Sequence, residues 1–198
     1  MSLLMIGCGK MAGALLARWA TSTEHTISVI NPSLVKAPPS VIVTQAIEEL
    51  SAQRFDIIVV AIKPQITVQV LPAYRHLLSD FSCLISIATG YSVWSIEKLI
   101  GEHAIIPVMA SLSAQIGRGV SGLYANSRCN FAQIKMATRL TDTIGYTHLA
   151  DSEDELVRVI AVAGRGSGYA FEFARCWIES TIKMGFQTRP AKTWYLTP

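Results

Sequence analysis

The sequence has little charge and no long hydrophobic run, and each absence excludes a class of protein. Only 16% of its 198 residues are charged and 51% are hydrophobic, so the chain can fill a sizeable core and is not disordered. No apolar run reaches the roughly 18 residues that span a bilayer, and no signal-type segment is present, so we expect no membrane partner. The net charge of +3 comes without a run of Lys or Arg. It therefore gives no case for nucleic acid and fits an anionic cofactor and a small anionic substrate.

The cysteines and histidines lack the spacing of metal sites. No C-x-x-C pair occurs, and each histidine stands alone in the sequence. We therefore expect no metal, no disulfide framework, and reduced thiols in a cytoplasmic protein. The four cysteines are Cys8, Cys83, Cys129 and Cys176. The histidines, which we interpret as surface or loop residues, are His25, His76, His103 and His148.

A glycine-rich turn near the N-terminus is the feature around which the rest is organised. An apolar run over residues 3–6 has the composition of a buried strand, and it leads into Gly7-Cys8-Gly9-Lys10-Met11-Ala12. In this G-x-G-x-x-A pattern the first glycine allows a tight turn and the second lets a pyrophosphate approach the backbone. The alanine lets the next helix pack closely on the sheet. That helix places apolar residues at helical spacing and leaves Arg18 facing water. The pattern predicts dinucleotide binding, and the alternative is a structural glycine turn.

The second strand, over residues 26–30, ends at Asn31-Pro32-Ser33. NAD-binding folds place an acidic residue near here to accept hydrogen bonds from the ribose 2′-OH. Asn31 is not acidic, Asn31 and Ser33 can donate to a 2′-phosphate, and Lys36 can add charge. We therefore expect NADP in preference to NAD, with an ordinary N-P-S turn as the alternative.

Strands and helices continue to alternate as far as residue 149. Residues 57–62 form a continuous apolar run, typical of a parallel strand covered on both faces, and it stops at Lys63-Pro64. Helical spacing over residues 66–78 and a strand over 83–88 follow, and then a strand over 104–109 that Pro107 marks as an edge strand. These elements predict an α/β fold with a Rossmann-type doubly wound sheet over residues 1–149.

Residues 150–198 read as a helical C-terminal segment. Asp151 or Ser152 can cap a first helix, glycines interrupt the chain at 164–168, and residues 169–184 form a long helix. That helix is apolar over more than one stripe, so it needs cover that one subunit is too small to give. We therefore expect a homodimer formed through the C-terminal helices.

Several segments together resemble the pyrroline-5-carboxylate reductase family. Residues 7–12 look like its G-x-G-x-M-A turn, 60–65 like its A-V-K-P-Q block and 85–90 like I-S-I-A-A-G. The resemblance implies NADPH-dependent reduction of the C=N bond of 1-pyrroline-5-carboxylate, a cyclic imine, to L-proline in proline biosynthesis. The cofactor contacts expected from the glycine turn and implied by the resemblance are Ile6, Gly7, Cys8, Gly9, Lys10, Met11, Asn31, Ser33, Lys36, Ala61, Ile62, Lys63, Pro64, Ala88, Thr89 and Gly90.

The sequence departs from the family pattern where the substrate should bind. The arginine that precedes V-M-P in the family is Pro107 here, and M-P-N-T-P has become the segment 109–113. The match also stops before the helices that carry a late substrate-binding threonine in the family, so the C-terminal segment is expected to be short. No general acid is identified, and the substrate-side candidates are Lys63, Ser111, Arg165, Gly166 and Ser167.

Two other functions remain open on the sequence. One is a catalytically impaired homologue that binds NADP and acts by association. The other is a different Rossmann imine or hydroxyacid reductase, which would need a lysine on the helix between the domains. Lys183 lies beyond the glycine block and fits that role poorly.

Overall fold

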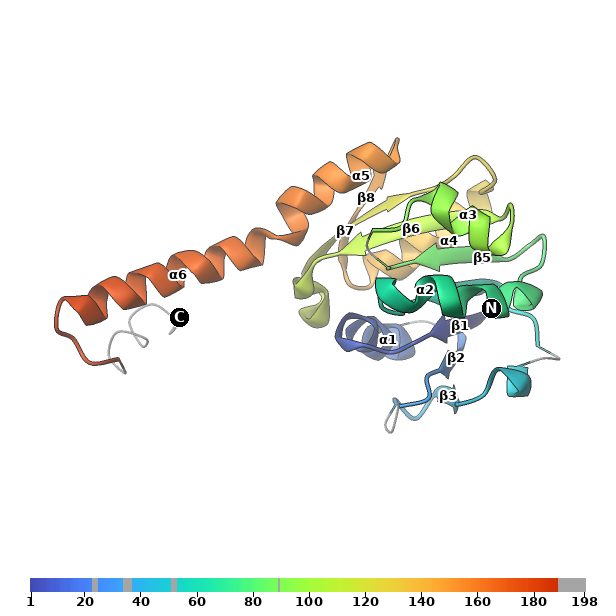
Figure 1. Cartoon of the computed structure of the whole chain (residues 1–198), viewed down its shortest axis with the longest axis horizontal. Helices are drawn as coiled ribbons and strands as arrows, with labels where there is room; N and C mark the ends of the chain where they lie inside the picture. The colour runs from blue at the N-terminus through green and yellow to red at the C-terminus, as the bar shows by residue number, and fades with distance from the viewer. Residues whose placement is uncertain (23–24, 34–36, 51–52, 89, 189–198) are drawn as a thin grey trace.

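The computed structural model describes residues 1–22, 25–33, 37–50, 53–88 and 90–188. Their strands are β1 (Ser2–Ile6), β2 (Thr26–Ile30), β3 (Val41–Thr44), β4 (Ile57–Val60), β5 (Cys83–Ser86), β6 (Ala104–Ala110), β7 (Gly119–Tyr124) and β8 (Gly145–Ala150). They form one sheet in the order β3-β2-β1-β4-β5-β6-β7-β8 (Figure 1). β6 and β7 pair antiparallel and the other neighbours pair parallel.

Helices connect the strands. The α-helices are α1 (Lys10–Ser22), α2 (Pro64–Val70), α3 (Val93–Ile100), α4 (Phe131–Asp142), α5 (Glu153–Val159) and α6 (Gly166–Lys183). The 3-10 helices are η1 (Ile47–Leu50), η2 (Leu71–Leu77) and η3 (Leu112–Ile116), and η4 (Ile160–Gly164) is a π-helical segment. The helix expected over 66–78 is thus split into α2 and η2, because Pro72 cannot donate an α-helical hydrogen bond.

Each face of the sheet carries its own hydrophobic core. Side chains of α1 and α4 pack on one face, where the Trp19 indole donates a buried hydrogen bond of 2.9 Å to the Leu140 carbonyl. Side chains of η2 and α3 pack on the other face. The sheet is therefore wound on both sides, which confirms the predicted α/β class.

The prediction that residues 104–109 form an edge strand is wrong. β6 lies inside the sheet, between β5 and β7. Its antiparallel pairing with β7 begins at Val108 opposite Leu123, so Pro107 precedes the first paired position on that side. Proline is tolerated inside this sheet because its missing N–H falls where the ladder has not yet begun.

Two side chains expected at the surface are half-buried instead. Arg18 packs over Gly117 and donates to the Thr143 carbonyl at 3.4 Å, so it does not face water freely. His148 lies within β8 and bonds to the Glu155 carboxylate at 2.8 Å, which corrects its interpretation as a surface or loop residue. Arg18 contacts Thr143, which is distant in sequence, and His148 contacts Glu155 on the helix that follows β8. Local sequence pattern reveals neither contact.

The C-terminal helices differ in how they are covered. Ser152 caps α5, which packs on β7 so closely that a Cβ at Gly122 would lie 2.7 Å from a Leu156 methyl group. The expected glycine interruption is shorter than predicted, since η4 ends at Gly164 and α6 begins at Gly166. α6 extends away from the sheet (Figure 1) and exposes its aromatic side chains Tyr169, Phe171, Phe173 and Trp177. No helix within the described ranges has both the length and the apolar character of a bilayer span.

Candidate active site

The candidate site lies at the carboxyl edge of β1, β4 and β5. The strand order reverses between β1 and β4, and such switch points are where ligands bind in open α/β sheets. Backbone hydrogen bonds hold the strand ends in register: Ala61 N–H donates to the Ile6 carbonyl (2.9 Å), and Ile87 N–H to the Val60 carbonyl (3.0 Å). The segments singled out in the sequence at 6–11 and 61–64, together with Ala88 at the end of the third segment, therefore meet at one edge.

The two glycines of the turn face different surroundings. Gly7 has a φ of +84°, and a Cβ there would lie 2.8 Å from a methyl group of Ile62 and 2.9 Å from the Ala61 carbonyl oxygen. A Cβ at Gly9 would meet nothing within 4 Å. Gly7 is thus required by the fold, whereas Gly9 opens onto free space at the start of α1. That open space beside a helix N-terminus fits a diphosphate group.

The rest of the turn is open or partly covered. Lys10 is exposed and Met11 is half-buried at the start of α1. Cys8 is also half-buried, and burial raises the pKa of its thiol, so the side chain is neutral near pH 7. A neutral thiol here adds no negative charge beside the place where phosphates would bind.

The end of β2 carries the expected polar pair. Asn31 is half-buried, and its side-chain oxygen accepts a hydrogen bond of 3.2 Å from the Ser33 backbone N–H. This leaves the Asn31 amide nitrogen and the exposed Ser33 hydroxyl as donors above the turn. Lys36, the predicted source of positive charge, lies outside the described residues.

Two loops of the edge are joined by a residue that sequence reasoning did not single out. The Tyr91 hydroxyl donates to the Pro64 carbonyl at 2.9 Å and so ties the loop after β5 to the start of α2. Lys63, directly before α2, is exposed, and its carbonyl accepts from the Thr67 hydroxyl. Ala88 is buried and Gly90 is exposed with a φ of +88°, while Thr89 lies outside the described residues.

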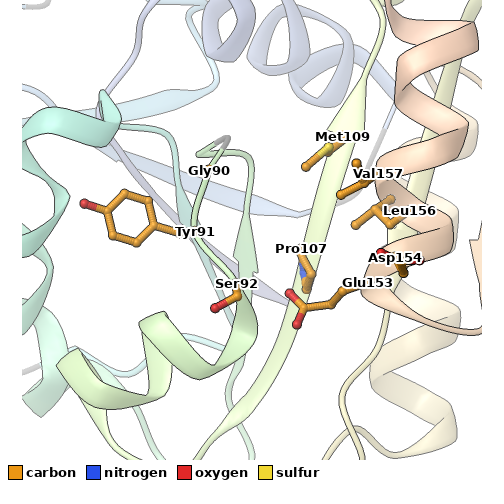
Figure 2. Close-up of a pocket in the computed structure, with 9 residues that line it drawn as sticks. All are labelled: Gly90, Tyr91, Ser92, Pro107, Met109, Glu153, Asp154, Leu156 and Val157. Atoms are coloured by element: carbon orange, nitrogen blue, oxygen red, sulfur yellow. The ribbon is translucent and has the colours of Figure 1, made fainter.

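A cavity of about 230 Å³ opens next to Gly90, between α3 and α5 (Figure 2). Its polar feature is the Glu153 carboxylate, whose Oε1 accepts a hydrogen bond of 2.8 Å from the Val93 backbone N–H. The sequence offered Glu153 only as one of three acidic residues in a helix first turn, and no local signal indicated its contact with α3. The lining residues are Gly90, Tyr91, Ser92, Pro107, Met109, Glu153, Asp154, Leu156 and Val157.

The substrate-side candidates do not gather around this cavity. Ser111 is buried, and its hydroxyl accepts a hydrogen bond of 2.9 Å from Val120 N–H, which fixes the start of β7. Arg165 and Gly166 are exposed at the junction of η4 and α6. The side chain of Ser167 lies outside what the structure describes. Their role toward a substrate stays a prediction.

The strand order, the glycine turn and the open carboxyl edge define the class of the chain, a Rossmann-type dinucleotide-binding fold. Residues 2–90 match the family described as NADP oxidoreductase, coenzyme F420-dependent. Prephenate dehydrogenase from Aquifex aeolicus shares the fold at 14% identity, covering 90% of this chain and 70% of that chain with a TM-score of 0.64.

Closer similarity is found with one family within this class. The pyrroline-5-carboxylate reductase of Pseudomonas aeruginosa is 30% identical over 137 residues, covering 69% of this chain and half of that protein. The Plasmodium falciparum pyrroline carboxylate reductase, solved with NADP bound, superposes with a TM-score of 0.84 at 27% identity, covering 99% of this chain and 74% of that chain. By sequence and by fold, the chain is thus similar to the pyrroline-5-carboxylate reductases, as its motifs predicted.

Proposed function

We propose that this chain reduces 1-pyrroline-5-carboxylate to L-proline with NADPH, as an enzyme of proline biosynthesis. The observation that carries the proposal is the meeting of the turn, the Lys63-Pro64 loop and the Gly90 loop at one sheet edge, with open space above Gly9. The relatives with this name support it. Because the chain spans only half of the Pseudomonas aeruginosa protein, the activity is argued from these residues as well.

The residues present fit the coenzyme. Backbone amides at the start of α1 bind the diphosphate, and the bare Cα of Gly9 lets it approach them. The Asn31 amide and the Ser33 hydroxyl donate to the 2′-phosphate, with no acidic side chain at this position to repel it. We assign the coenzyme contacts to the sixteen residues predicted from the sequence, and we expect NADPH to bind more tightly than NADH.

When bound, the reduced nicotinamide supplies the hydride. The chain positions and shields the reacting groups: Tyr91 fixes two edge loops against each other, and Lys63 lies at the rim where it can contact coenzyme or substrate. Positioning of this kind supplies much of the rate in such a transfer. We place the activity in the cytoplasm, where thiols such as the four free cysteines stay reduced.

We further propose a homodimer formed through α6, with residues 1–149 as the coenzyme domain and 150–198 as the helical segment. Phe173 and Trp177 contact each other with ring centroids 4.5 Å apart and ring planes tilted by 45°, yet both are at least half exposed. Exposed aromatic rows of this size mark association surfaces. In the proposed dimer, a partner subunit covers these exposed rings.

A second candidate is a protein that binds NADP without turnover. It is favoured by Ser111, whose hydroxyl accepts a hydrogen bond from the Val120 N–H, and by Arg165, which is exposed and does not line the cavity. Two measurements on the purified chain separate the candidates: a tryptophan-fluorescence titration with NADPH and NADH, and NADPH oxidation with 1-pyrroline-5-carboxylate, with L-proline identified by mass spectrometry. Binding and proline formation support the reductase, and binding without proline supports the second candidate. Failure to bind either coenzyme contradicts both.

A further inference from the structure

The cavity between α3 and α5 has a chemistry of its own. Its walls are apolar at Pro107, Met109, Leu156 and Val157, and its volume of about 230 Å³ is enough for a small ring. Gly90, which belongs to the coenzyme edge, also lines it. The cavity therefore adjoins the place where the hydride is delivered.

The charged side chains that line the cavity are both acidic. Glu153 is held in place because its Oε1 accepts from the Val93 N–H, and no Lys, Arg or His is among the lining residues. Asp154 also lines the cavity, but its carboxylate is largely exposed and lies 3.7 Å from the Arg158 guanidinium. Glu153 is thus the acidic group that is fixed in the cavity, held by the first N–H of α3, and no cationic side chain lines the cavity beside it.

A second polar group, Ser86, neighbours the lining residue Pro107 without lining the cavity itself. Ser86 pairs with Pro107 across the sheet, and strand alternation puts both on the face that carries α3, since Leu84 and Ile105 belong to the core on that face. Ser86 is 3% exposed, and its hydroxyl has no hydrogen-bond partner within the described chain. A buried hydroxyl without a partner is costly unless a ligand satisfies it.

We infer that this cavity holds the nitrogen side of the substrate as a cation, with the Glu153 carboxylate as its counter-ion. The inference rests on the proposed function and names its specificity: a small cyclic iminium or secondary ammonium, not a neutral ketone. An anionic carboxylate in an apolar cavity favours the protonated form of a C=N nitrogen. The protonated imine then accepts the hydride at carbon, and the π electrons of the C=N bond become the nitrogen lone pair of a neutral amine. The imine nitrogen takes its proton from water before the hydride arrives, so the step needs no side chain as a general acid.

The test uses probes that separate charge from shape. Pyrrolidine carries the ring and the cation without a carboxylate, and cyclopentanecarboxylate carries the ring and the anion without nitrogen. Glu153→Gln keeps an acceptor for the Val93 N–H but removes the charge. Glu155→Gln makes the same change two residues on, where the side chain bonds to His148 and the Asp151 N–H instead.

We expect Glu153→Gln to weaken pyrrolidine and L-proline binding at least about tenfold by calorimetry. Cyclopentanecarboxylate and NADPH binding should stay within twofold, and Glu155→Gln should leave all of these affinities as they are in the unmodified protein, measured at a temperature where both variants are folded. Pro107→Arg, which places a cation against Glu153, should abolish pyrrolidine binding. Equal pyrrolidine affinity for the Glu153→Gln and Glu155→Gln variants overturns the inference even if NADPH is bound and oxidised. A chain that binds pyrrolidine through Glu153 but never binds NADPH contradicts the proposed function and leaves the cation site standing.

Discussion

The two glycines of the N-terminal turn should respond in opposite ways to the same substitution. Gly7→Ala forces a side chain onto a residue with φ of +84° and brings Cβ within 2.9 Å of the Ala61 carbonyl oxygen. The left-handed conformation costs about 1–2 kcal/mol and the overpacking about 1–3 kcal/mol, so the free energy of unfolding should fall by about 2–5 kcal/mol. For a chain of this length, this corresponds to a loss of roughly 4–20 °C in Tm.

Gly9→Ala meets no protein atom within 4 Å, so the free energy of unfolding should change by less than about 1 kcal/mol. The new methyl group instead occupies the space assigned to the diphosphate. Losing one charge-assisted hydrogen bond there, worth about 1.5–3 kcal/mol, weakens NADPH binding roughly 10- to 150-fold.

Thermal unfolding followed by circular dichroism, and fluorescence titration with NADPH, measure the two effects separately. The reasoning on the turn is refuted if the Gly9→Ala variant binds NADPH as tightly as the unmodified chain. It is equally refuted if the variant loses as much stability as Gly7→Ala, since Gly9 would then serve the fold and not the coenzyme.

Three further predictions concern the surface, the core and the response to acid. Trp177→Glu in α6 should raise the dimer dissociation constant at least about 100-fold in analytical ultracentrifugation, because two buried rings are lost per dimer at about 1.5–3 kcal/mol each. If the unmodified chain is already a monomer, this prediction is contradicted. Asn126→Ala should lower the free energy of unfolding by about 2–4 kcal/mol in urea titrations. The buried Asn126 amide accepts from the Ile105 N–H and donates to the His103 carbonyl at the start of β6, and both bonds are lost. A loss of stability below about 1 kcal/mol contradicts this prediction. The Asp151 N–H and the His148 ring hold the pKa of Glu155 below its usual value, so Glu155→Gln should lower stability at neutral pH. The difference should vanish as pH falls through the lowered pKa, and a difference that grows in acid contradicts it.

Local pattern was sufficient for most of the elements and for the sheet edge that carries the glycine turn. The run of apolar residues before Gly7 and the run at 57–62 predicted strands that lie side by side in the sheet, and parallel strands bring their carboxyl ends to one edge. The positions of Gly7, Asn31 and Lys63 at that edge follow from this rule alone. Local pattern does not predict which distant strands pair. It therefore placed Pro107 on an edge strand, although β7 and β8 lie beyond β6 in the sheet.

The cavity shows why the proposed substrate side is harder to predict than the proposed coenzyme side. The coenzyme turn is continuous in sequence, whereas the cavity is built from three segments centred on residues 91, 108 and 155. Glu153 looks in sequence like any acidic residue that favours a helix N-terminus, and only the packing of α5 on β7 brings it to the Val93 N–H. A site built from side chains that are distant in sequence leaves no motif in any one segment. A substrate site can therefore be specific even where the family's sequence motif has been lost. For this chain, the departures from the motif thus argue for a changed way of holding the substrate as readily as for a lost activity.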